Sequence, residues 1–317
     1  MAEHRIAFAL QAAPRSMAEW TDLARRAESG GFDALCVADH PGTTKSPFVS
    51  LAAAAAVTER IQLGTAVVNG GVCEPMTLAA DVATLDLLSG GRAYLGLGAG
   101  HTPAEWEMVG RRYPSPAERV DRFGELLATV PALVAGDTVT FSGAHLQLDG
   151  ARLAFSTGRR VPLLVGGSNP RLLRLGAEQA DMVEVSGTGR TLADGHSHEA
   201  RWSPSDVARS TDLVRAAAAR AGRHVVLGAL VQFAELTDDP EGWMAARLGR
   251  AGDAVPPEHL PSVADALASP YAMVGSLDDV VAKIDQGAAR WGLTRYTLRS
   301  VEVGAQVIAA RRAAEAR

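Results

Sequence analysis

The sequence predicts an α/β protein built as a (β/α)8 TIM barrel with insertions. Short apolar segments typical of buried parallel strands recur through the 317 residues and alternate with helical segments. Eight such strands suit a closed barrel better than an open sheet. The chain is also longer than the roughly 250 residues that such a barrel needs. A predicted hairpin and several long loops account for the surplus.

One unit, residues 61–101, shows the pattern that the rest of the chain repeats. Residues 61–68 are apolar almost throughout and predict a strand. Pro75 suits the first turn of the next helix, because its missing N–H has no helical partner there. Glycines 90 and 91 end that helix, since glycine adopts the left-handed cap conformation, and a second strand follows over 93–97. The unit is therefore a βαβ crossover, which is right-handed almost without exception.

The other elements follow in chain order. The eight predicted strands are residues 6–11, 34–38, 61–68, 93–97, 161–165, 182–185, 225–233 and 296–298. The predicted helices are residues 17–29, 47–58, 75–88, 116–134, one that begins at 170, 204–221, 240–248, 257–267, 277–291 and a C-terminal amphipathic helix. Residues 137–148 alternate in polarity around Ser142-Gly143 and predict an inserted hairpin. No linker divides the chain, so residues 1–317 are expected to form a single domain.

Composition argues against several classes of protein. The net charge of −5 argues against nucleic acid as the main partner. The longest apolar run, near residues 51–57, is too short to cross a bilayer, and no signal-peptide core follows residues 1–5. Cys36 and Cys73 lie in or beside strand-like segments, which favours buried thiols in a reducing cytosol over a disulfide framework. We expect a cytoplasmic protein that acts on a small molecule, with no membrane partner.

In this fold the active site lies at the carboxyl ends of the barrel strands. Asp39-His40 directly follows the apolar strand ALCVA, where a carboxylate and an imidazole can bind a ligand and move a proton near neutral pH. The alternative interpretation is an aspartate that caps the next helix beside an exposed histidine. At this strand end, the functional interpretation is favoured.

Two glycine-rich turns follow other strands. Gly166-Gly167-Ser168-Asn169 precedes a helix, and its glycines and helix N-terminus suit a phosphorylated ligand, although a well-capped turn is the alternative. Gly98-Ala99-Gly100-His101 lets a flat ligand approach the backbone and adds a second titratable group, but it lacks the third glycine of a dinucleotide fingerprint. His196 and His198 have no convincing further ligand, so a solvated loop and no metal site are expected.

Several longer stretches point to a family. They are GFDALCVADH (31–40), IQLGTAVVN (61–69), LAADVATLDLLSGGR (78–92) with GLGAG (96–100), ERVDRF (118–123), VPLLVGGSNPRLLRLGAEQADMV (161–183) and ASPYAMVGSLDDVVAKI (268–284). Together they resemble the luciferase-like flavin and deazaflavin oxidoreductases, and within them the coenzyme F420-dependent branch common in actinobacteria.

The resemblance implies a barrel, often a homodimer, that holds the deazaflavin ring in its mouth. It implies cofactor-binding residues at Asp39, Val68, Asn69, Gly70, Gly98, Gly100, Gly166, Gly167, Ser168 and Asn169. It also places an unusual peptide bond behind the ring at a strand-three bulge, which the resemblance aligns with Asn69-Gly70. The chain departs from relatives at residues 69–75, at His101 and at the TLRS segment of residues 297–300.

The leading hypothesis is a coenzyme F420-dependent oxidoreductase that transfers a hydride to or from a C=C, C=N, carbonyl or alcohol group. His40 would carry the coupled proton, Asp39 would orient it or bind the ring, and His101 is the alternative proton donor. Loops 101–115 and 187–203 would cover the substrate.

Three other functions stay open. One is an FMN-dependent monooxygenase on the same fold, since both cofactors are tricyclic rings with a ribityl phosphate. Another is a non-catalytic barrel that binds a flavin or deazaflavin. A phosphosugar isomerase or aldolase ranks last, because the two lysines, Lys45 and Lys283, are poorly placed for Schiff-base chemistry.

Overall fold

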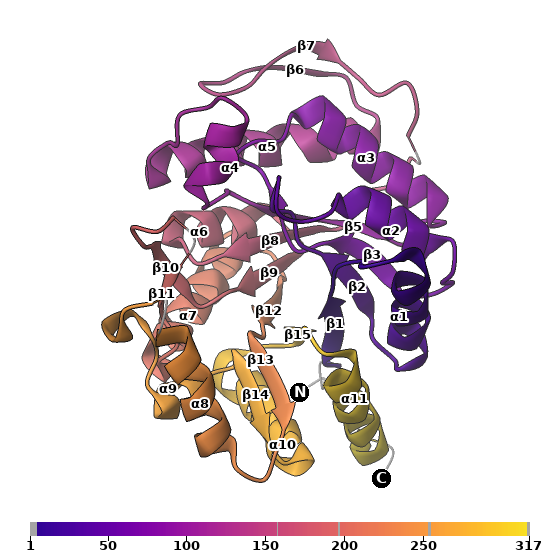
Figure 1. The fold of residues 1–317 in the computed structure, drawn as a ribbon. Helices are drawn as coiled ribbons and strands as arrows, with labels where there is room; N and C mark the ends of the chain where they lie inside the picture. Colours follow the sequence, from indigo (N-terminus) through magenta and orange to yellow (C-terminus); the bar gives the residue numbers. More distant parts are fainter. Residues whose placement is uncertain (1–4, 157, 196, 253–254, 316–317) are drawn as a thin grey trace.

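A closed barrel of parallel strands forms the centre of the molecule, and this confirms the predicted (β/α)8 fold (Figure 1). The structure is a computed structural model that describes residues 5–156, 158–195, 197–252 and 255–315. The barrel strands are β1 (Ala7–Gln11), β2 (Ala34–Val37), β3 (Gln62–Thr65) continued by β4 (Val68–Asn69), β5 (Ala93–Gly98), β8 (Leu163–Gly167), β9 (Met182–Val185), β12 (Val226–Leu230) and β15 (Arg295–Leu298). The sheet closes because β1 pairs with β15 and β3 pairs with β5.

Helices surround this barrel (Figure 1). They are α1 (Met17–Ser29), α2 (Pro47–Ala55), α3 (Pro75–Leu88), α5 (Pro116–Ala135), α6 (Pro170–Gln179), α7 (Pro204–Arg220), α10 (Leu277–Trp291) and α11 (Val301–Glu315). Local sequence fixes many of their ends. Ser115 and Glu118 form a capping box at the start of α5, and Gly136 ends that helix in the left-handed conformation. Proline opens α2, α3 and α5 to α7, as expected for the first helical turn.

Insertions extend the loops between the barrel strands and helices. They are the hairpin β6 (Val139–Ser142) and β7 (Gln147–Ala151), helix α4 (Pro103–Met108), the hairpin β10 (Thr188–Thr191) and β11 (His198–Ala200), the parallel pair β13 (Phe233–Leu236) and β14 (Ala272–Gly275), helices α8 (Pro240–Gly252) and α9 (Val263–Ala268), and the 3-10 turn η1 (Pro257–His259). The predicted hairpin within 137–148 is confirmed, with β7 extending to Ala151.

The structure corrects three element predictions and adds elements that were not predicted. The predicted strand 61–68 is divided into β3 and β4, and the predicted strand 225–233 ends at Leu230, with β13 beginning at Phe233. The predicted helix 257–267 is η1 followed by α9, because Pro261 lies between them. Strand β14 was not predicted, although its AMVG segment is fully buried. The prediction about residues 1–5 concerns a segment that lies largely outside the described residues.

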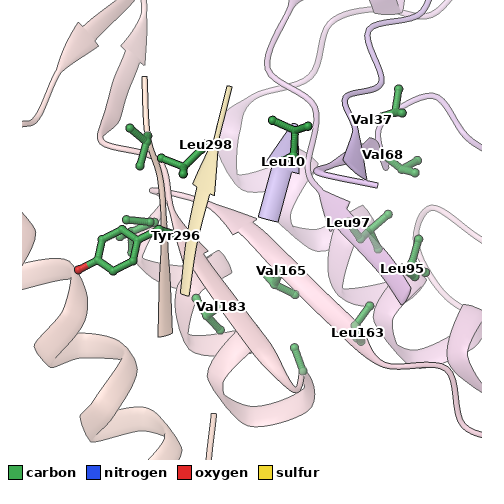
Figure 2. Close-up of a cluster of buried hydrophobic side chains, with 14 of the residues drawn as sticks. Leu10, Val37, Val68, Leu95, Leu97, Leu163, Val165, Val183, Tyr296 and Leu298 are labelled. Atoms are coloured by element: carbon green, nitrogen blue, oxygen red, sulfur yellow. The ribbon is translucent and has the colours of Figure 1, made fainter. Parts of the chain in front are cut away.

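The core has an outer layer between sheet and helices and a smaller layer inside the barrel. Side chains alternate along each strand, so residues two apart share a layer. Figure 2 shows part of the outer layer. Its labelled members are Leu10, Val37, Val68, Leu95, Leu97, Leu163, Val165, Val183, Tyr296 and Leu298. The inner layer consists of Ala9, Ala34, Cys36, Ala66, Tyr94 and Leu164. Cys36 is fully buried and, like Cys73, a free thiol.

A buried ion pair crosses the barrel interior beside this inner layer. Arg295 on β15 donates to Glu184 on β9 at 2.6 Å. Both residues are buried, with exposed fractions of 5% for Arg295 and 3% for Glu184. Thr297 also donates to the Glu184 carboxylate, and Arg295 donates to the Tyr94 hydroxyl at 3.3 Å. Both charges of this buried pair are therefore compensated, as burial requires.

Within the described part of the chain, no helix combines the length and the apolar character needed to cross a bilayer.

Candidate active site

A cavity of about 920 Å³ opens at the carboxyl ends of the barrel strands, where the fold places active sites. Its walls come from the loops after β5, β8 and β9 and from the β10–β11 hairpin. This volume lies in the range of pockets that bind cofactors or drug-sized ligands. Loops 101–115 and 187–203, which the sequence assigned to covering the substrate, both contribute to the lining.

The floor of the cavity is formed where β3 gives way to β4. The peptide bond between Ala66 and Val67 is cis, and the Val67 side chain lies between two glycines. A Cβ atom at Gly98 would lie 2.7 Å from Val67 Cγ2, and one at Gly166 would lie 2.8 Å from Val67 Cγ1. Glycine is required at both positions because the valine methyl groups occupy that space. The unusual peptide bond was expected at Asn69-Gly70, so that position is corrected to Ala66–Val67.

Asn69, at the end of β4, connects two neighbouring loops. Its backbone N–H donates to the Asp39 carboxylate at 3.1 Å, and its side-chain carbonyl accepts from the Gly71 N–H at 2.9 Å. Its amide nitrogen donates to Glu105 Oε2. A Cβ atom at Gly100 would lie only 2.0 Å from Asn69 Oδ1, so this glycine lets the asparagine approach. Gly100 also has a φ of +73°, which suits glycine.

His40 forms the other half of this network. Its Nδ1 lies 2.7 Å from Glu105 Oε1, and Glu105 is only 3% exposed. The hydrogen bond that His40 donates to the Glu105 carboxylate raises the pKa of His40 above its usual value of 6.5. Because Nδ1 is engaged, Nε2 is the ring atom that remains to exchange a proton with a ligand. Burial raises the pKa of the neighbouring Asp39 carboxyl.

Two further histidines extend from this pair across the mouth. The His101 ring packs edge-on against His40 at a centroid distance of 5.5 Å and against His198 at 4.5 Å. Burial and the two neighbouring imidazoles lower the pKa of His101 to about 4, so it is neutral at pH 7. His198 lines the cavity, which corrects the predicted solvated loop at this position. His196 lies outside the described residues.

The turn after β8 is arranged as a capped helix start that borders the cavity. Residues 166–170 all line it. The Asn169 side-chain oxygen accepts from the N–H groups of Arg171 and Leu172, so it caps α6. The capped turn is therefore observed, and Gly167 and Ser168 line the cavity beside it.

The cavity lining is strongly cationic. Among the described lining residues, the arginines are Arg119, Arg174, Arg190, Arg201 and Arg209, whereas Asp206 is the one carboxylate. Asp206 pairs with Arg209 at 2.7 Å and Arg201 with Glu199 at 3.3 Å. Arg119 has no carboxylate partner within the described ranges; its guanidinium lies 4.5 Å from the centre of the Tyr113 ring, and burial lowers its pKa. Such a surface suits an anionic ligand.

The structure thus brings Asp39, His40, Asn69 and His101 together, and it places Gly70 beside them, where its N–H donates to the Gly98 carbonyl at 2.9 Å. Val68 points away from the cavity into the outer core (Figure 2). Sequence reasoning missed Glu105, Val67 and Arg119. Glu105 lies in the short helix α4 after the glycine-rich turn, and its segment PAEWEM does not distinguish it from any acidic residue near a helix start.

A family model described as luciferase-like monooxygenase matches residues 1–295. The chain is 37% identical over 195 residues to an F420-dependent glucose-6-phosphate dehydrogenase of Beutenbergia cavernae, covering 59% of this chain and 57% of that protein. It is 32% identical over 163 residues to a 5,10-methylenetetrahydromethanopterin reductase of Methanolobus tindarius, covering 51% of this chain and 48% of that protein. The matches therefore span about half to three fifths of these curated relatives.

Solved structures share the fold over nearly the whole chain. An F420-dependent secondary alcohol dehydrogenase in complex with an F420-acetone adduct superposes with a TM-score of 0.76 at 21% identity, covering 96% of this chain and 97% of the other. The monooxygenase RslO1 from Streptomyces bottropensis gives a TM-score of 0.75 at 24% identity with the same coverage. A dehydrogenase and a monooxygenase thus share this architecture.

Proposed function

We propose that this chain, which belongs to the luciferase-like monooxygenase family, is a coenzyme F420-dependent oxidoreductase. Its substrate is a small organic molecule. The observation that carries the proposal is the hydrogen-bonded pair His40–Glu105 at the barrel mouth, beside a cationic cavity of about 920 Å³. The F420-dependent enzymes among the relatives support the choice of cofactor.

The residues present fit this cofactor. Gly98, Gly100 and the Val67 methyl groups form a close-packed surface on which a flat ring can lie. Gly167, Ser168 and the N-terminal turn of α6 suit the phosphate. Arg119 and Arg174, which lack carboxylate partners within the described ranges, suit the remaining negative charge. When bound, the deazaflavin supplies a two-electron hydride carrier.

The chain's own contribution is proton transfer and positioning. Glu105 accepts from His40 Nδ1–H, which orients the imidazole and leaves Nε2 to take a proton from an alcohol or to give one to a carbonyl. Asn69 fixes Glu105 and, through its backbone N–H, Asp39. His101 is a poor proton donor near pH 7, because its pKa is about 4. We therefore assign the proton to His40 and a packing role to His101.

The pH dependence of turnover tests this assignment. Neutral His40 is the base for substrate oxidation, so kcat/KM in that direction should rise with pH through a pKa above 6.5. In the reducing direction protonated His40 is the acid, and kcat/KM should fall through the same pKa. In Glu105→Gln the hydrogen bond to a carboxylate is lost, so this pKa should move down toward 6.5. The same pKa in both proteins would contradict the role of Glu105.

An FMN-dependent monooxygenase is the second candidate, because luciferase-like monooxygenases share the fold. Oxygen uptake separates the two functions. The proposed enzyme turns over under strict anaerobiosis, whereas a monooxygenase consumes oxygen in proportion to product.

A further inference from the structure

Arg299 lies just beyond the two inward-facing polar residues of β15. Arg295 and Thr297 both point into the barrel, where they bind Glu184. Arg299 is the second residue after Thr297, and its Nε bonds to Gln11 at the end of β1, so its side chain lies beside the end of that neighbouring strand. It comes directly after Leu298, the last residue of the strand, and is therefore at the carboxyl end of the barrel. The residue belongs to the TLRS segment in which this chain departs from the sequences that it resembles.

Gln11, at the end of β1, holds the Arg299 side chain. The Gln11 amide nitrogen donates to the Ala66 carbonyl at 2.6 Å, which turns the amide oxygen toward Arg299. That oxygen accepts from Arg299 Nε at 3.0 Å. This bond fixes the Nε edge of the guanidinium. Its two terminal nitrogens make no hydrogen bond or ion pair with any residue that the structure describes.

No carboxylate neutralises this cation in the described ranges. Glu184 lies beneath it but already pairs with Arg295. Glu302, three residues along the chain, pairs with Arg26 at 2.6 Å. The side chain is open to solvent, yet the surrounding protein desolvates it enough to lower the pKa of the guanidinium. The charge also acts on His40, whose pKa it lowers slightly against the larger effect of Glu105.

We propose that Arg299 binds an anionic group of the substrate, a carboxylate or a phosphate, and thereby sets the substrate class of the proposed oxidoreductase. A guanidinium with a fixed Nε edge and free terminal nitrogens presents paired donors that match the two oxygens of such a group. Arg299 does not line the cavity assigned to the cofactor. The substrates are therefore hydroxy or oxo acids, or phosphate esters that carry a reducible or oxidisable group near His40.

Ligand binding tests this inference, which rests on the proposed function, without requiring turnover. The probes are sodium acetate, its neutral isostere acetamide and inorganic phosphate, added to the protein saturated with coenzyme F420. Saturation-transfer difference NMR follows the methyl signals of acetate and acetamide, and phosphate is measured as a competitor of acetate. The variants are Arg299→Gln and, as a matched control, Arg220→Gln, which removes an exposed arginine at the end of α7.

We expect acetate to bind at least about tenfold more tightly than acetamide, a difference of one charge-assisted contact. Arg299→Gln should abolish that preference, and Arg220→Gln should keep it. Stronger competition by phosphate than by free acetate would identify phosphate esters as the substrates, and the reverse would identify carboxylic acids. Equal binding of acetate and acetamide, or a preference that survives in Arg299→Gln, would overturn the inference.

The two proposals can fail separately. If the wild-type protein does not bind coenzyme F420, the proposed function is contradicted. The acetate titrations are then repeated on the cofactor-free protein. There the difference between wild type and Arg299→Gln still reports the anion subsite. A preference for acetate that depends on Arg299 would support the subsite without the cofactor, and its absence would reject both.

Discussion

Replacing His40 with alanine is expected to lower kcat by about 10²–10⁴-fold, the usual contribution of a positioned acid–base group. The variant removes the Nε2 atom that exchanges the proton and leaves Glu105 without its imidazole partner. Binding of coenzyme F420 should persist, because the glycine-rich turns and the arginines of the cavity are unchanged. Turnover is measured through the fluorescence of the oxidised coenzyme, and binding by titration of the same samples.

The matched control is His224→Ala, which removes an exposed histidine between α7 and β12. Its kcat should equal that of the wild type. Added imidazole should restore part of the activity of His40→Ala but not of Glu105→Gln, since only the first variant lacks the ring. Full activity in His40→Ala would assign the proton to another group, and His101 would then be the next candidate.

Replacing Glu184 with alanine is expected to reduce the free energy of unfolding by about 3–5 kcal/mol, because it leaves Arg295 buried without its charge partner. The exposed pair between Glu302 and Arg26 provides the comparison. Glu302→Ala should cost less than about 1 kcal/mol, since surface ion pairs contribute little. Urea denaturation measures both.

A second variant separates the charge from the packing. In Glu184→Leu combined with Arg295→Met, both charges are replaced by apolar side chains, so most of the lost stability should return. If the double variant is as unstable as Glu184→Ala, the defect lies in cavity formation and not in an unpaired arginine. If Glu184→Ala lowers the free energy of unfolding no more than Glu302→Ala does, the buried pair does not contribute to stability as described.

The architecture of the barrel was readable from local sequence. Apolar strand segments, proline at helix starts and glycine at helix ends each depend on neighbours within a few residues, and most predicted elements agree with the structure to within a few residues. Asp39 and His40 were predicted as candidate site residues for a similar reason. The fold rule selects strand ends, and these residues follow an apolar strand directly.

The features that were missed depend on pairings distant in the chain. Glu105 is 65 residues from His40, and nothing in PAEWEM distinguishes it from an acidic residue that favours a helix start. Glu184 and Arg295 are 111 residues apart, and each looks like a polar interruption of its own strand. The steric reason for glycine at positions 98 and 166 was also missed, because the contact that requires it comes from Val67, between β3 and β4.

Equilibrium titration of the purified cofactor-free protein with coenzyme F420 and with FMN, side by side, tests the central claim most directly. The account predicts a Kd for coenzyme F420 that is micromolar or tighter and weaker binding of FMN. It also predicts that Arg119→Glu weakens the binding of coenzyme F420 by about 10–100-fold, in keeping with the loss of a contact to a charged group. The control variant Arg220→Glu should leave the Kd unchanged. Tighter binding of FMN, or binding of neither cofactor, would contradict the account.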